Sequence, residues 1–282
     1  MATKKKSAVV AVAILGILLI IAALLNITGF WKNNQYRFLH NHKHLHLTLG
    51  DKELFWFYAV HTNNPNDIMY RILEDAFQSF SPDLVLVEGG ANVFEGTRDQ
   101  ALGMGEPDFA TYLAKRNNIR VADIEPPFAR QIAYLQERYD PEDIFAMYVL
   151  RQIGSWELLP EAADRDFDAF ALGEIRFLTG NGLLYDGTSP DHVLATMNRH
   201  LPQPMDRDNW LNLNVYRTYA RGEGIVNEIY LDIVHFRDIH AVELIREKQQ
   251  THNRIFIVMG GAHLSAVEEP LREIYAGQSP PK

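Results

Sequence analysis

The sequence predicts a mixed α/β fold: a mainly parallel central sheet with flanking helices and a helical insertion, preceded by one transmembrane helix. Short, wholly apolar segments at residues 84–87 and 255–259 have the composition of buried strands. Segments with helical periodicity lie between them, which is typical of a parallel sheet covered on both faces. A long uncharged run at residues 8–25 precedes this whole pattern.

The N-terminal segment has the pattern of a signal anchor. Three lysines at positions 4–6 precede the uncharged run, which as a helix spans roughly 27 Å, close to the thickness of the bilayer hydrocarbon. The lysines favour a cytoplasmic N-terminus, and no small-residue cleavage site follows the run. We therefore expect residues 1–28 to form a cytoplasmic stub and an uncleaved anchor in the cell membrane. Residues 29–282 would then form an extracytoplasmic domain.

Composition excludes several classes of protein. The chain has no cysteine, which rules out disulfides, thiolate metal ligands and thiol nucleophiles. Its formal charge is −9, and because the anchor segment carries three lysines and no acid, the remainder carries −12. An acidic domain repels phosphate backbones, so nucleic acid is not an expected partner.

Periodicity places the elements of the domain. Alternation at residues 37–49, a Gly-Asp turn and an apolar segment at 54–60 predict an opening β-hairpin. A helix is expected at 68–80, capped by Asn66 or Asp67. The remaining expected elements are a strand at 84–87, a helix at 109–117, a strand at 119–124, a helical insertion at about 140–222, a long helix at 225–249 and a strand at 255–259.

The first predicted strand carries a row of histidines on one face. Alternate residues of a strand share a face, so neighbouring pairs of the row are able to bind a metal. An exposed polar face is the more common meaning of such a row, and the sequence leaves both interpretations open. The row consists of His40, His42, His44 and His46.

Four predicted strands lead into residues with useful chemistry: His61, Glu88, Glu125 and His263. Ligands of open α/β sheets bind outside the carboxyl ends of the strands, and neighbouring strands lie about 4.8 Å apart. Each residue alone is better explained as a structural residue of a loop or turn than as a functional one. Their joint occurrence predicts one site, and two imidazoles with carboxylates suit zinc, manganese, cobalt or iron.

Arg237 is a further candidate site residue. It follows Ile229 and Ile233 at spacings of four on the stripe of the long helix that should face the core. A buried arginine is costly unless it is paired or binds an anion, so we expect it inside, near His263. The adjacent Asp238 should point elsewhere. The alternative is an arginine that extends to solvent at the edge of the stripe.

Three segments of the sequence carry a resemblance to a known family. The segment SPDLVLVE, which ends at Glu88, is similar to the PD-x-V-x-V-E segment of the TraB/PrgY family, which includes the GumN and Tiki proteins. The tripeptide FRD at 236–238 and the segment IFIVMGGAHL at 255–264 resemble the RD helix and the closing V-V-G-x-x-H-L of that family. The order and spacing of the segments also agree.

The resemblance implies a site made of His61, Glu88, Arg237 and His263, with Glu125 as a looser match. Tiki proteins are described as metal-dependent peptidases, and PrgY as acting against a peptide pheromone. Related folds include erythromycin esterases and haem-binding lipoproteins, so the fold does not fix the substrate. The family's G-x-x-H motif reads Tyr58 to His61 here, so we expect the tyrosine ring to narrow the site.

The function expected from these observations is that of a membrane-anchored, extracytoplasmic, metal-dependent hydrolase acting on a peptide or similar substrate. His61, Glu88 and His263 would hold a divalent ion (Mn, Co or Zn), and Arg237 would steady a developing oxyanion or a substrate carboxylate. Glu125 would act as general base or orient a histidine. Two alternatives remain: a non-catalytic protein that binds a peptide, haem or metal, and a metal-independent, esterase-like hydrolase that uses His61.

Overall fold

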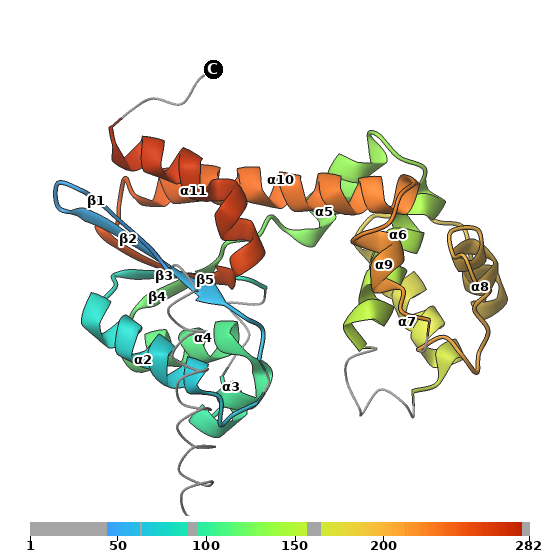
Figure 1. The fold of residues 1–282 in the computed structure, drawn as a ribbon, viewed down its shortest axis with the longest axis horizontal. Helices are drawn as coiled ribbons and strands as arrows, with labels where there is room; N and C mark the ends of the chain where they lie inside the picture. Colours follow the sequence, from blue (N-terminus) through green and yellow to red (C-terminus); the bar gives the residue numbers. More distant parts are fainter. Residues whose placement is uncertain (1–43, 63, 90–94, 157–164, 212, 278–282) are drawn as a thin grey trace, which may run out of the picture.

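The computed structural model describes residues 44–62, 64–89, 95–156, 165–211 and 213–277 (Figure 1). The expected anchor at 8–25, the start of the expected first strand and two histidines of its row, His40 and His42, lie outside these residues. Within the described residues, none of the helices combines the length and the apolar character needed to cross a membrane.

A five-stranded mixed sheet forms the centre of the fold. Its strands are β1 (Leu45–Leu49), β2 (Lys52–Ala59), β3 (Leu84–Val87), β4 (Arg120–Asp123) and β5 (Arg254–Gly260), in the order β1-β2-β5-β3-β4. The β1 and β2 strands pair antiparallel as the opening hairpin, and the remaining pairs are parallel. The predicted mixed, mainly parallel sheet is therefore confirmed.

Helices cover both faces of this sheet. The helices α2 (Ile68–Phe80), α3 (Arg98–Met104) and α4 (Glu106–Arg116) pack on one face, and α11 (Gly261–Tyr275) with the C-terminal half of α10 (Ile225–Lys248) packs on the other. Phe256 and Val258 of β5 belong to the first core, and Ile255 and Ile257 belong to the second. Successive residues of a strand point to opposite faces, so a strand buried on both sides must be apolar throughout.

A separate core fills the helical lobe. It is built by α5 (Phe128–Gln136), α6 (Pro141–Trp156), α7 (Phe167–Gly180), α8 (Pro190–Asn198) and α9 (Tyr216–Tyr219), together with the first half of α10. Figure 1 shows α10 running from this lobe to the sheet. Val226 and Ile229 at its start belong to the helical core, whereas Ala241 and Ile245 belong to the sheet core. The helices α6 to α9 lie within the range expected for a helical insertion, about 140–222, and α5 and the start of α10 add to the same core.

Local sequence signals fix several boundaries. Of the two expected caps, Asp67 is the one that caps α2, since its Oδ1 accepts the N–H of Met69 at 2.9 Å. Three helices were not among the expected elements, namely α3, α5 and α11. The last of these begins at Gly261, directly after β5, so His263 lies in the first turn of a helix.

Asp83 joins the starts of two central strands. It precedes β3, and its carboxylate accepts the N–H of Asn253 at 2.8 Å and the N–H of Arg254, the first residue of β5, at 3.1 Å. These contacts lie at the amino edge of the parallel strands, away from the edge that carries His61 and Glu88. The Pro-Asp part of the motif therefore has a structural role.

We predict that Asp83→Ala lowers the free energy of unfolding by about 1–2 kcal/mol, because two backbone N–H groups lose a charged acceptor at a solvent-exposed position. Urea denaturation of the purified chain measures this. Asp75→Ala, at an exposed position of α2, is the matched control and should change stability by less than about 0.5 kcal/mol. Equal effects of the two substitutions would show that the hydrogen bonds of Asp83 contribute nothing to stability.

Candidate functional site

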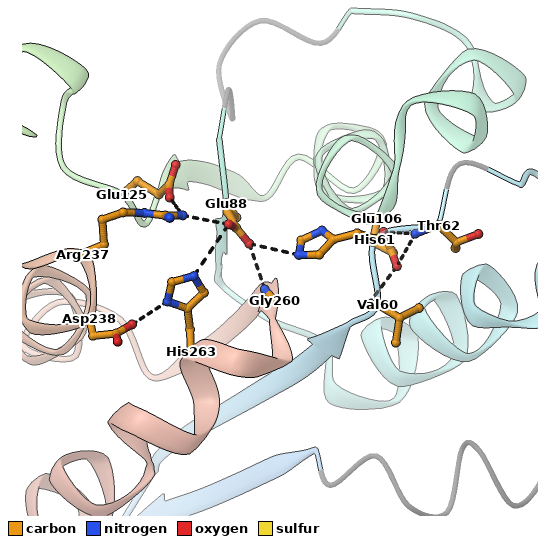
Figure 2. Close-up of polar contacts among 10 residues, drawn as sticks. All are labelled: Val60, His61, Thr62, Glu88, Glu106, Glu125, Arg237, Asp238, Gly260 and His263. Atoms are coloured by element: carbon orange, nitrogen blue, oxygen red, sulfur yellow. Dashed lines mark hydrogen bonds and ion pairs between the residues drawn. The ribbon is translucent and has the colours of Figure 1, made fainter. Parts of the chain in front are cut away.

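The carboxyl edge of the sheet brings the predicted site residues together. His61 and Glu88 follow β2 and β3, Glu125 follows β4, and His263 starts α11 directly after β5. The Nε2 atom of His61 lies 3.8 Å from Oε2 of Glu88, and Nε2 of His263 lies 3.9 Å from Oε1 (Figure 2). The predicted convergence of the two histidines and the carboxylate is confirmed, and each histidine approaches a different oxygen.

Glu88 is a fixed anion at the centre of this group. Nη2 of Arg237 donates to its Oε1 at 2.8 Å, and the backbone N–H of Gly260 donates to its Oε2 at 2.9 Å. Burial by itself raises the pKa of Glu88, but Arg237, the Gly260 amide and the two histidines outweigh burial and lower the pKa to about 2. The carboxylate therefore stays charged throughout the neutral range.

Arg237 is buried between two carboxylates. Its side chain is 4% exposed and forms ion pairs with both Glu88 and Glu125. The prediction that it lies inside and near His263 is confirmed, because both residues contact the same oxygen of Glu88. Both ion pairs use Nη2 and tie the guanidinium to the two carboxylates, so these contacts favour a role in holding the carboxylates over the expected role in steadying an oxyanion.

Asp238 also belongs to the site, and the expectation that it points elsewhere is wrong. Its Oδ1 lies 2.5 Å from Nδ1 of His263, and both side chains are buried. Because α11 crosses beside α10, the side chain next to Arg237 meets the first turn of α11 while Arg237 meets the strand ends. A carboxylate at Nδ1 fixes the ring and leaves Nε2 directed toward Glu88.

Glu106 binds the backbone on both sides of His61, and this role was not predicted from the sequence. It is fully buried, and its carboxylate accepts the N–H groups of Val60 at 3.1 Å and Thr62 at 3.2 Å (Figure 2). These bonds flank His61, which has a φ of 61°, uncommon for a residue other than glycine. Glu106 therefore holds the backbone that carries His61, while the His61 side chain is 59% exposed and has room to turn.

A pocket of about 470 Å³ opens beside the site, and Tyr58 lines it without filling it. A Cβ atom at position 261 would lie 1.8 Å from the Tyr58 ring, and one at position 260 would lie 2.7 Å from Nε2 of His61. Gly260 and Gly261 therefore make room for the tyrosine and for the histidine. The pocket also reaches the helical lobe, where Arg151 and Tyr230 line it.

The tightest candidate metal group of the described residues lies elsewhere. Glu142, Asp186 and His192, in the helical lobe, place ligand atoms within 4.8 Å of one another, and the three predicted ligands at the sheet edge do not. Glu142, however, is already engaged by the guanidinium of Arg199. At the sheet edge the two histidines flank opposite oxygens of Glu88, so the candidate ligand atoms are spread more widely than those in the helical lobe.

The described part of the histidine row has protein partners. Nε2 of His46 lies 3.0 Å from Glu53, and the ring of His44 stacks on Phe57 with centroids 4.6 Å apart. These contacts favour the interpretation of the row as a polar, structural face.

The chain matches none of the known protein-family models, and none of the curated proteins matches it. The resemblance to the TraB/PrgY family therefore remains a prediction, which depends on the three sequence segments and on their positions in the fold.

We predict that Gly261→Ala destabilises the fold by about 1–3 kcal/mol, although alanine is the better helix former, because the new methyl group clashes with the Tyr58 ring. Thermal unfolding measures the change. Gly173→Ala in α7, where a methyl group meets no atom within 4 Å, is the control and should be neutral or stabilising. The double variant Tyr58→Leu/Gly261→Ala should recover part of the loss, and no recovery would contradict the steric account.

Proposed function

We propose that this protein is a membrane-anchored, extracytoplasmic, metal-dependent hydrolase, peptidase-like in its chemistry, whose divalent ion is held by His61, Glu88 and His263. One observation carries the proposal. A histidine oriented by Asp238 faces a charged glutamate at the carboxyl edge of a parallel sheet, with a second histidine on the other side and an open pocket beside them.

The charge of the site supports a cation. Glu88, Glu125 and Asp238 contribute three carboxylates, whereas Arg237 contributes one permanent positive charge. Buried charge is costly unless it is balanced, so the excess of negative charge favours either a bound metal ion or protonated histidine. The 3.8 Å and 3.9 Å separations from Glu88 to the two histidines are close to those that an ion with bonds of about 2.1 Å can bridge. The exposed His61 is the ligand that would turn to complete the set.

Each residue of the site has a role that follows from its contacts. The bound ion would supply Lewis acidity and a water of lowered pKa. Asp238 holds the proton on Nδ1 of His263, so that Nε2 keeps its lone pair. Arg237 keeps Glu88 ionised and fixes Glu125 beside it. Glu125 therefore fits the expected role of an orienting partner better than that of a general base.

A metal-independent hydrolase is the second candidate, and one observation favours it. Arg237 already donates a hydrogen bond to the Glu88 oxygen that His263 faces, so this oxygen has one lone pair fewer to offer an ion. In that case the buried Asp238–His263 pair, rather than His61, has the arrangement of a general base and its orienting carboxylate.

We predict that the full-length chain, purified in detergent and stripped with a chelator, binds one Mn²⁺, Co²⁺ or Zn²⁺ ion at the sheet edge. His263→Ala and Glu88→Gln should each weaken binding at least about 10-fold, since each removes a ligand. His192→Ala, which breaks the group of Glu142, Asp186 and His192 in the helical lobe, is the matched control and should leave this binding unchanged. Calorimetry and elemental analysis measure the affinity and the stoichiometry.

Hydrolysis of a peptide library, followed by mass spectrometry, tests the reaction itself. We expect that chelation removes the activity and that adding the ion back restores it. Activity that survives chelation but is lost in Asp238→Asn would instead support the metal-independent candidate. Metal or haem binding without hydrolysis of any peptide would identify a binding protein. Metal binding that is lost in His192→Ala and kept in His263→Ala would refute the proposed site.

A further inference from the structure

A second pocket lies in the helical lobe, among side chains of α5, α6 and α7. It has a volume of about 300 Å³ and combines an apolar wall of three side chains with five side chains that carry a polar group. The wall is formed by Phe128 of α5 with Phe177 and Leu178 of α7, and the two phenylalanine rings pack against each other with centroids 4.9 Å apart. Apolar walls with a small number of polar groups are typical of pockets that bind small molecules or side chains.

Arg151 of α6 connects this pocket to the site at the sheet edge. Its side chain lines both the pocket of about 470 Å³ that holds Glu88 and His263 and the pocket of about 300 Å³ in the helical lobe. Arg151 is partly buried, and among the described residues no carboxylate lies within ion-pair distance of it. A guanidinium group is a planar fork that suits a carboxylate, so its place between two pockets points to an anionic group of a ligand.

The second pocket also holds a buried polar group without a partner, although its Gln152 and Ser155 side chains hydrogen-bond to each other. Tyr148 is 6% exposed, and its buried hydroxyl has no hydrogen-bond partner among the described residues. Burial raises the pKa of Tyr148, and the positive charge of Arg151 opposes this effect. Burial also raises the pKa of Glu174 to about 7, so much of this carboxyl is uncharged at neutral pH and repels an anion less. A buried hydroxyl without a partner is costly, and a ligand acceptor would satisfy it.

We propose that Arg151 binds the terminal carboxylate of a peptide substrate, whose last side chain is apolar or aromatic and packs against Phe128 and Phe177 in the second pocket. This inference rests on the proposed hydrolase function, because the peptide bond before that last residue would then lie in the pocket that contains Glu88 and His263. The site would accordingly favour peptides that end in a free carboxylate. An acidic side chain of a peptide is the other source of a carboxylate, and the experiment separates the two.

Binding of small probes to the full-length chain in detergent tests the inference without requiring catalysis. N-acetylphenylalanine should bind at least about 10-fold more tightly than N-acetylphenylalanine amide, because only the former offers the carboxylate. Arg151→Gln should abolish this preference. Arg176→Gln, which removes the same charge from an exposed position on α7 outside both pockets, is the matched control and should retain it.

Two further variants test the roles of the apolar wall and of the planar guanidinium. Phe177→Ala should reduce the preference for N-acetylphenylalanine over N-acetylalanine and leave the preference for the carboxylate unchanged. Arg151→Lys keeps the charge without the fork and should show an intermediate preference, with thermal unfolding of each variant as the check on folding. Equal binding of the acid and the amide to the unaltered chain would overturn the inference.

The source of the carboxylate has its own probe. N-acetylaspartic acid α-amide offers only a side-chain carboxylate. If it binds as tightly as N-acetylphenylalanine, and Arg151→Gln weakens its binding, the assignment of Arg151 to the C-terminal carboxylate is overturned. Loss of the carboxylate preference in Arg151→Gln, in a protein that hydrolyses no peptide, would support the binding site and contradict the hydrolase. Hydrolysis at the same rate with and without a free C-terminal carboxylate would support the hydrolase and contradict the role of Arg151.

Discussion

The buried ion pairs of Arg237 with Glu88 and Glu125 are the interaction on which the rest of the site depends. They join α10 to the ends of β3 and β4, and they keep the glutamate between the two histidines ionised. Because α10 also carries part of the core of the helical lobe, the same ion pairs help to set the position of that lobe over the pocket. Removing one partner of such a buried group leaves an uncompensated charge and typically costs about 3–5 kcal/mol.

The negative charge that Arg237 leaves uncompensated links this structure to its proposed chemistry. One guanidinium cannot neutralise the carboxylates of Glu88, Glu125 and Asp238, and the proposed cation would balance the negative charge that is left. The two histidines that face Glu88 are the groups able to share such an ion or to carry a proton in its place. Arg151 also lines this pocket and adds a second guanidinium to it.

Sequence reasoning succeeded where a local pattern carries the information. The apolar composition of β3 and β5 predicted a sheet buried on both faces, and the residues after these strands predicted the edge at which the site lies. The four-residue spacing of Arg237 predicted its burial. Asp238 and Glu106 were missed because their partners, His263 and the backbone around His61, are distant in sequence and depend on how helices cross. No periodicity signals such contacts, and the pockets beside α6 likewise arise only from packing between helices.

A double-mutant cycle on Arg237→Gln and Glu88→Gln, followed by urea denaturation, tests most directly whether this ion pair organises the site. We expect a coupling free energy of at least about 2 kcal/mol, because Arg237→Gln leaves the buried Glu88 without its counter-charge and Glu88→Gln leaves Arg237 with Glu125 alone. The exposed pair Arg207 and Asp168, whose atoms lie 2.7 Å apart, provides the reference and should couple by less than about 1 kcal/mol. Additive effects of the two substitutions at Arg237 and Glu88 would contradict the account.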